Sequence, residues 1–121
     1  MKPTNVVLYQ NDARTAQVLA TNLSRYFPSV YTAKNSDEVR SAIARYRAEV
    51  VVLDVEASGP SAVESLHEEF PSVSIVCTHR LADEKLWAAA LQKGAADMCV
   101  PWNSDEVIRS VIRDRARRAA A

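Results

Sequence analysis

The sequence predicts an α/β fold made of five consecutive strand–helix units in a single domain that spans residues 1–121. Five short apolar runs, most of them rich in β-branched residues, alternate with five stretches whose apolar residues recur at helical spacing. Each unit takes roughly 20 to 25 residues, and no low-complexity linker interrupts the series. Right-handed crossovers then require an open, doubly wound parallel sheet with helices on both faces, which makes three layers.

Three of the five predicted strands are nearly continuous apolar runs, which is typical of strands that are buried on both faces of a sheet. The predicted strands cover residues 6–9, 30–33, 50–53, 73–77 and 98–100. Cys77 and Cys99 lie inside the last two runs, so we expect buried thiols rather than a disulfide framework.

The helices between the strands are predicted by apolar residues that recur every three or four positions. These residues are Ala16, Leu19, Leu23 and Tyr26; Val39, Ile43 and Tyr46; Val63, Leu66 and Phe70; Leu86, Ala89 and Ala90; and Val107, Ile108, Val111 and Ile112. The predicted helix starts are the oxygen-bearing residues Asp12, Ser36 and Asn103–Ser104. Gly94 predicts the end of the fourth helix, and Pro28 and Pro71 follow the expected ends of the first and third.

The composition is that of a soluble globular protein, with 48% hydrophobic and 25% charged residues. Lys plus Arg and Asp plus Glu each number 15, so there is no basic excess for direct nucleic-acid binding. Arginines crowd the last turns of the chain, where we expect a solvated helix end that suits the helix dipole. No signal peptide is recognisable and no apolar run approaches the ~18 residues of a membrane span, so we expect a cytoplasmic protein without a membrane partner.

Polar residues follow the predicted strands at their carboxyl ends, which is where open α/β sheets bind ligands. Gln10, Asn11 and Asp12 follow the first strand, Asp54 ends the third, and Thr78 ends the fourth. A carboxylate at the end of a buried strand is costly unless it has partners or a function. Asp54 is therefore either a site residue or a cap for the loop that follows, whereas β-propensity explains Thr78 equally well.

These residues, together with the five strand–helix units, resemble the receiver domain of bacterial response regulators over nearly the whole chain. The resemblance is carried by residues 50–54, 74–78 and 93–97. It implies a flavodoxin-like fold whose parallel strands follow the order 2-1-3-4-5. It also implies that Asp54 accepts a phosphoryl group from a histidine kinase or a phosphotransfer protein, with Mg²⁺ bound beside it and Thr78 hydrogen-bonded to the phosphoryl group.

The sequence departs from the receiver pattern at positions that carry charge. Gln10 and Asn11 occupy the places of the two acids that help to hold Mg²⁺, and residues 98–102 lack the lysine that pairs with the phosphate. The candidate Mg²⁺ ligands that remain are Asp54, Asp12, Asn11 and Glu56. Asp12 is more simply explained as the cap of the first helix. The resemblance, with these departures, therefore predicts weak Mg²⁺ binding or none.

Two further departures surround the expected site. His79 replaces the small residue that normally follows the hydroxyl, and we expect it either to narrow the pocket or to lie partly exposed in its loop. Met98 takes the place of the aromatic switch residue of the family, so the usual rotamer readout is missing.

The loops themselves predict one ion pair. Glu56 lies two residues after Asp54, and Arg80 lies two residues after Thr78. Because these loops are neighbours at the same edge of the sheet, we expect the two charged side chains to approach each other across the pocket. The guanidinium would then cover the pocket or lie near a bound anion.

A partner surface is predicted around the fourth helix. Trp87 and Leu91 lie on a different stripe from the core-facing residues of this helix, and Trp102 opens the last loop. Tryptophan is enriched in binding hot spots, although packing in the core or at its rim is the alternative explanation. In receiver domains the face made by the fourth helix, fifth strand and fifth helix commonly binds a partner or forms a homodimer, so we expect the same here.

Two functions follow from these observations, and neither is enzymatic. The first is a receiver domain of a phosphorelay with Asp54 as phosphoacceptor in a depleted pocket. The second is a receiver-derived interaction module that works without phosphorylation. A nucleotide-binding domain is disfavoured because the chain has only two glycines and no glycine-rich loop after the first strand.

Overall fold

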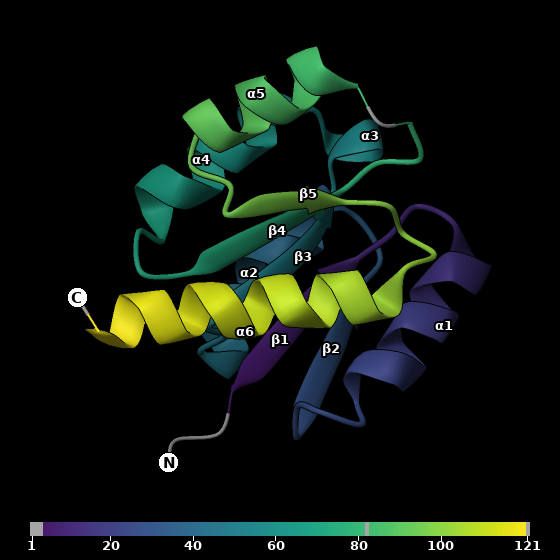
Figure 1. Cartoon of the computed structure of the whole chain (residues 1–121). Coiled ribbons are helices and arrows are strands. Elements are labelled where there is room, and N and C mark those ends of the chain that lie inside the picture. The colour runs from purple at the N-terminus through teal and green to yellow at the C-terminus, as the bar shows by residue number, and fades with distance from the viewer. Residues whose placement is uncertain (1–3, 82, 121) are drawn as a thin grey trace.

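The protein forms a five-stranded parallel sheet with helices on both faces (Figure 1). The computed structural model describes residues 4–81 and 83–120. The strands are β1 (Asn5–Tyr9), β2 (Ser29–Ala33), β3 (Val50–Asp54), β4 (Ser74–Thr78) and β5 (Asp97–Cys99). Their order in the sheet is β2-β1-β3-β4-β5, which confirms the predicted topology.

Six helices lie within the described residues, one more than predicted. They are α1 (Ala13–Leu23), α2 (Ser36–Tyr46), α3 (Val55–Ser58), α4 (Pro60–Glu69), α5 (Glu84–Gln92) and α6 (Ser104–Ala120). The additional helix is the single turn α3, which follows β3 directly. Among these helices none has the length and apolar character needed to cross a membrane.

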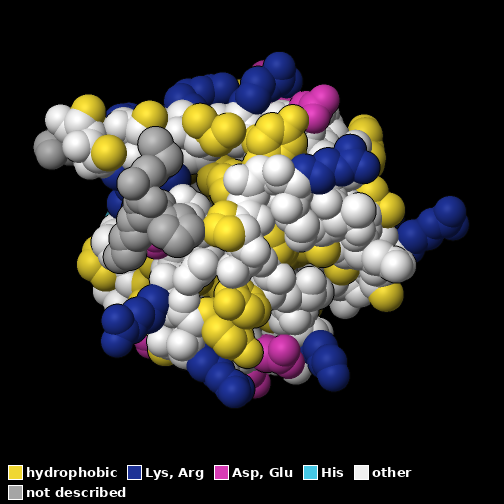
Figure 2. All heavy atoms as spheres, turned by 90° about the horizontal axis from the view of Figure 1, so that it is seen from below, with side chains coloured by type: hydrophobic (Ala, Val, Ile, Leu, Met, Phe, Trp, Pro, Cys, Tyr) yellow, Lys and Arg dark blue, Asp and Glu magenta, His cyan; other side chains and the backbone are white. Residues whose placement is uncertain are grey.

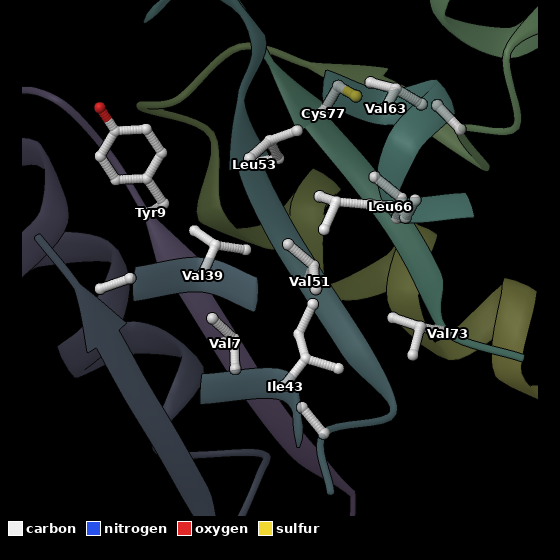
Figure 3. Close-up of a cluster of buried hydrophobic side chains, with 14 of the residues drawn as sticks. Val7, Tyr9, Val39, Ile43, Val51, Leu53, Val63, Leu66, Val73 and Cys77 are labelled. Carbon is white, nitrogen blue, oxygen red and sulfur yellow. The ribbon is translucent and has the colours of Figure 1, made fainter. Parts of the chain in front are cut away.

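The strands bury side chains on both faces of the sheet. Val7, Val51 and Cys77 point towards α2, α4 and α5, in the cluster drawn in Figure 3. Val6 and Val52 point to the opposite face, which α1 and α6 cover. Successive residues of a strand alternate between the two faces, so a strand covered on both sides must be apolar throughout.

Both cysteines are free and buried, as predicted. Burial raises the pKa of Cys77 to about 12 and that of Cys99 to about 11. Both thiols are therefore protonated at neutral pH and serve as small core residues.

The capping residues agree with the sequence in two of three cases. The carboxylate of Asp12 caps α1, and Asn103 Oδ1 accepts a backbone N–H in the first turn of α6 at 3.1 Å. The predicted start at Ser36 matches the beginning of α2, but the capping side chain is that of Asn35, whose Oδ1 accepts the N–H of Glu38 at 2.9 Å. Ser36 is instead the first helical residue.

The first helix is shorter than predicted. It ends at Leu23, and the N–H groups of Tyr26 and Phe27 both donate to the carbonyl of Leu23, at 3.0 and 2.9 Å. This turn buries Phe27 and leaves Tyr26 62% exposed, so Pro28 closes a turn rather than a helix. Ile112 of α6, also assigned to a core-facing stripe, is 51% exposed.

The arginine-rich end of α6 is not simply a solvated helix end. Arg115 Nη2 pairs with Glu49 Oε2 at 3.0 Å, and its Nη1 donates to the carbonyl of Ser72 at 3.1 Å. Arg118 Nε pairs with the buried Asp114 at 2.8 Å. The contacts of Arg115 fasten α6 to the amino ends of β3 and β4, whereas the pair between Arg118 and Asp114 lies within α6. On the face drawn in Figure 2, most Lys and Arg side chains lie around the rim rather than together.

Candidate functional site

An open cavity of about 500 Å³ lies at the carboxyl ends of the strands, where the topology predicted the site. We call it the carboxylate cavity. Its wall includes Gln10, Asn11, Asp12, Asp54, Glu56 and Arg80. The structure therefore brings together the predicted phosphoacceptor and all the candidate Mg²⁺ ligands in one place. Thr78 lies beside them as the cross-strand neighbour of Asp54 in the β3–β4 register.

Asp54 is half-buried at the end of β3, and backbone groups occupy both of its carboxylate oxygens. Oδ1 accepts the N–H groups of Glu56 and Ala57 at 3.1 and 3.2 Å, which makes Asp54 the cap of α3. Oδ2 accepts the N–H of Asn11 at 3.0 Å, which ties β3 to the loop after β1. The carboxylate thus has the capping role that the sequence left open, and it also faces the cavity.

Asp54→Ala is expected to lower the free energy of unfolding by about 1–2 kcal/mol, because three backbone N–H groups lose their acceptor. Urea denaturation measures the change. Asp83→Ala provides the matched control, since Asp83 caps α5 through two N–H groups and, among the described residues, its side chain bonds to no other loop. A loss for Asp54→Ala no larger than that for Asp83→Ala would show that the bond to Asn11 contributes nothing.

Gln10 has a role that the sequence reasoning missed. Its Nε2 donates to Thr78 Oγ1 at 2.7 Å, and both residues are buried, at 7% and 1% exposure. The amide thus donates to the oxygen of Thr78 from a position where response regulators have an acid. The available signal was an amide at the end of a buried strand, because a buried polar group requires a partner.

The predicted ion pair between Glu56 and Arg80 is confirmed. Arg80 Nε lies 3.0 Å from both carboxylate oxygens of Glu56, Nη2 also donates to Oε2, and the N–H of Arg80 reaches Oε1 at 3.3 Å. The hydrogen bond from the Arg80 side chain lowers the pKa of Glu56 from 4.5 to about 2. The pair is therefore present at neutral pH and is lost only as the pH falls towards 2.

The candidate Mg²⁺ ligands around the cavity do not form the acidic Mg²⁺ site that receiver domains have. Asp12 Oδ2 accepts from the backbone N–H and hydroxyl of Thr15 at 2.9 and 2.7 Å, which confirms its role as a cap. Glu56 is engaged by Arg80, and Asn11 contacts Asp54 through its backbone. Within residues 4–81 and 83–120, no group of three or more His, Cys, Asp or Glu residues could hold a metal ion.

The surroundings of the cavity also differ from the receiver pattern. Lys93 Nζ pairs with Glu64 at 2.8 Å, away from the cavity, and so does not replace the missing lysine. Of the two possibilities for His79, the structure supports the half-exposed loop residue. Its Nδ1 accepts the N–H of Leu81 at 2.9 Å, and its side chain lines a different cavity.

This second cavity is a groove of about 760 Å³ between α5, β5 and α6, which we call the Trp87 groove. His79, Leu81, Trp87 and Met98 line it, with Asp83 and Glu84 on one side and Arg109 and Arg113 on the other. Of the three predicted partner residues, only Trp87 lines this groove. Leu91 lines a separate cavity, and Trp102, 68% exposed, lines neither.

No protein-family model matches the chain, and no curated protein matches it significantly. Solved structures do match. A signal receiver domain of an HD-domain-containing protein from Pseudomonas fluorescens Pf-5 has a TM-score of 0.87 at 18% identity, over 99% of this chain and 100% of that one. CheY from Borrelia burgdorferi, in a complex with CheX, BeF3 and Mg, has a TM-score of 0.81 at 22% identity, over 92% and 88%.

NtrX from Brucella abortus is similar with a TM-score of 0.87 and 18% identity, and there the match covers 98% of this chain. The chain spans only 28% of the length of that protein. The sheet order, the helices on both faces and these matches all agree. The chain therefore has the flavodoxin-like fold of response regulator receiver domains.

Proposed function

We propose that this chain is a receiver-type signalling domain of a two-component system that acts through protein contacts, without Mg²⁺-dependent phosphorylation. The hydrogen bond between Gln10 and Thr78 carries this proposal. In response regulators the hydroxyl at the end of the fourth strand donates to the phosphoryl group, and an acid after the first strand helps to hold Mg²⁺. Here the amide of Gln10 takes the place of that acid and donates to the oxygen of Thr78. The amide also removes one of the negative charges that Mg²⁺ requires in that position.

The other side chains around the cavity support the same function. Phosphoryl transfer to a carboxylate depends on cations that neutralise the phosphoryl oxygens. Here Arg80, the basic side chain in the cavity wall, is bound to Glu56, and Asp54 accepts three backbone N–H groups.

Phosphorylation of Asp54 by a histidine kinase or phosphotransfer protein is the second candidate. It is favoured by one observation, namely that Asp54 faces an open cavity with Thr78 as its cross-strand neighbour. Weak Mg²⁺ binding by Asp54 with Asp12, Asn11 and Glu56 belongs to this second function.

The Trp87 groove is the proposed partner surface. Trp87 is 45% exposed and Leu81 is 70% exposed, and both line the same groove, so they form a shared apolar surface rather than isolated exposed side chains. The lining of the groove carries both acidic residues, among them Glu84 and Glu106, and the basic residues Arg109 and Arg113, so a protein partner or a second copy of the chain with charges of both signs would pair with it. Leu91 and Trp102 would lie outside this contact.

Beryllofluoride with millimolar Mg²⁺ tests the proposal directly. We expect the amide NMR signals of residues 54–58 and 78–81 to remain unchanged, because the cavity lacks the charges that hold the metal and the anion. Asp54→Asn serves as the control. Signals that shift in the wild type but not in Asp54→Asn would establish the second function instead.

A further inference from the structure

The two edges of the sheet, β5 and β2, differ in how they are protected. β5 has only three residues, and its first residue, Asp97, turns its carboxylate back onto the chain. Oδ1 of Asp97 accepts the N–H of Met98 at 2.8 Å, and Oδ2 accepts the hydroxyl of Ser110 at 2.5 Å. A short edge strand with an inward-turned charge pairs poorly with a further strand. The β5 edge is therefore blocked.

The β2 edge lacks these protections. Its strand is five residues long, and Ser29–Ala33 contains neither a charged residue nor a proline. Among residues 4–81 and 83–120, β1 is the only strand that pairs with it. Alternate residues of an edge strand direct their backbone N–H and C=O groups away from the sheet. β2 thus presents a row of donors and acceptors that a further strand can use.

Apolar side chains lie on both sides of this edge. On the side of α2, Tyr31 stacks on Tyr46, with ring centroids 3.7 Å apart and ring planes at 4°, and both residues are half-buried. On the opposite face of β2, Val30 is half-buried and Thr32 is exposed. Figure 2 views the molecule from the side on which β2 lies in Figure 1, and hydrophobic side chains are exposed near the middle of this face.

The charged residues nearest to β2 in the sequence are basic. Arg25 lies four residues before the strand and Lys34 follows it directly, with no acidic residue between them. Arg45 lies over the aromatic pair, with its guanidinium carbon 5.4 Å from a ring centroid. All three are exposed, and among the described residues none forms an ion pair. The surroundings of the β2 edge are therefore complementary to a negatively charged segment.

We propose that the β2 edge binds an extended, acidic segment of a partner protein as an additional strand. Backbone hydrogen bonds to β2 hold the segment, and its alternate side chains contact the tyrosine pair on one side and Val30 on the other. Its carboxylates pair with Arg25, Lys34 and Arg45.

A second copy of the chain fits this edge less well than an acidic segment does. If two β2 strands paired in antiparallel fashion, the Lys34 end of each would lie beside the Arg25 end of the other, and these like charges repel. The β2 edge lies at the opposite side of the sheet from β5 and the Trp87 groove. The inference therefore goes beyond the proposed function and does not rest on it.

The test uses the full, isotope-labelled chain and a capped peptide in which valine and threonine alternate between pairs of glutamates. We expect the peptide to slow amide hydrogen exchange at alternate residues within 29–33 by at least about tenfold, because those N–H groups gain acceptors. The same peptide with every valine and threonine N-methylated cannot pair as a strand and should give no protection. Lysines in place of the glutamates should raise the Kd by at least about tenfold.

Lys34→Glu examines the charges on the protein itself. We expect it to raise the Kd of the acidic peptide by about tenfold, because an attraction becomes a repulsion. Lys85→Glu is the matched control, since it makes the same change at an exposed position of α5, which packs beside β5 at the other edge of the sheet. It should leave the Kd unchanged.

Unchanged exchange of residues 29–33 at millimolar acidic peptide would overturn the proposal. So would equal protection by the N-methylated peptide, or equal effects of Lys34→Glu and Lys85→Glu on the Kd. Protection of the same residues that grows with protein concentration, without any peptide, would assign the edge to a second copy of the chain and contradict the acidic partner. Retention of the amide spectrum of the remaining strands in each variant establishes that the fold is intact.

Discussion

Gln10→Asp combined with Asn11→Asp is expected to lower the Kd for Mg²⁺ by at least about tenfold. The attraction between two opposite unit charges ~4 Å apart is about 4 kcal/mol at an effective dielectric constant of 20, before the cost of desolvation is subtracted. Both positions line the carboxylate cavity together with Asp54, so the added carboxylates lie where a divalent cation would bind. The substitution also removes the amide that donates to the hydroxyl oxygen of Thr78. Isothermal titration calorimetry measures the affinity.

The control for this variant adds the same charge elsewhere. Gln17→Glu with Gln92→Glu introduces two carboxylates of nearly the native shape at exposed helix positions. We expect its Mg²⁺ affinity to match that of the wild type. If Gln10→Asp with Asn11→Asp bound Mg²⁺ no better than this control, the missing acids would not be the reason for the depleted pocket.

Gly94→Ala is expected to lower the free energy of unfolding by about 3 kcal/mol, from overpacking and backbone strain together. Gly94 follows the end of α5, as predicted, and has a φ of 119°. A Cβ added there would lie 2.5 Å from Cγ of His67 in α4. Close packing of α4 against α5 thus requires a glycine at this position. Urea denaturation measures the loss.

Gly59→Ala separates the two causes. Gly59 also has a positive φ, of 82°, but a Cβ there would meet only Ser61 Oγ at 4.0 Å. We expect a loss of about 2 kcal/mol from backbone strain alone, because a φ of 82° with a ψ of 160° is a conformation that is almost confined to glycine. Adding His67→Ala to Gly94→Ala should recover the part that is due to the contact. Equal losses for the two glycine variants would exclude the contact with His67 as a cause.

Much of the fold could be predicted from local patterns. Val50–Leu53 is apolar throughout because both faces of β3 are covered, and this property is visible in a single sequence. The end of α1 was not visible in the same way. Tyr26 continues the helical spacing, but the turn after α1 buries Phe27 and exposes Tyr26. Which of the two aromatic side chains is buried depends on the space in the core, and the sequence does not show that space.

The candidate site was predictable to the same extent. Asp54 and Thr78 end neighbouring parallel strands, so their proximity follows from the strand order. Glu56 and Arg80 each lie two residues after one of these strand ends, so their proximity follows as well. The contact between Arg115 and Glu49 could not be found, because α6 had to be placed across the amino edge of the sheet first. The long side chain of Arg115 reaches the carboxylate of Glu49, and no regular spacing in the sequence connects these two positions.

The sequence by itself determined the five strand–helix units, the edge of the sheet that carries the site, and the identity of the charges missing there. The tertiary structure alone decided how the remaining polar groups are used. Gln10 and Thr78 are 68 residues apart in the chain, and Asp54 could either cap a loop or face an open cavity. Burial patterns repeat along a chain and can be read from it. A hydrogen bond instead depends on the distance and direction between two particular atoms, which exist only once the strands are in register.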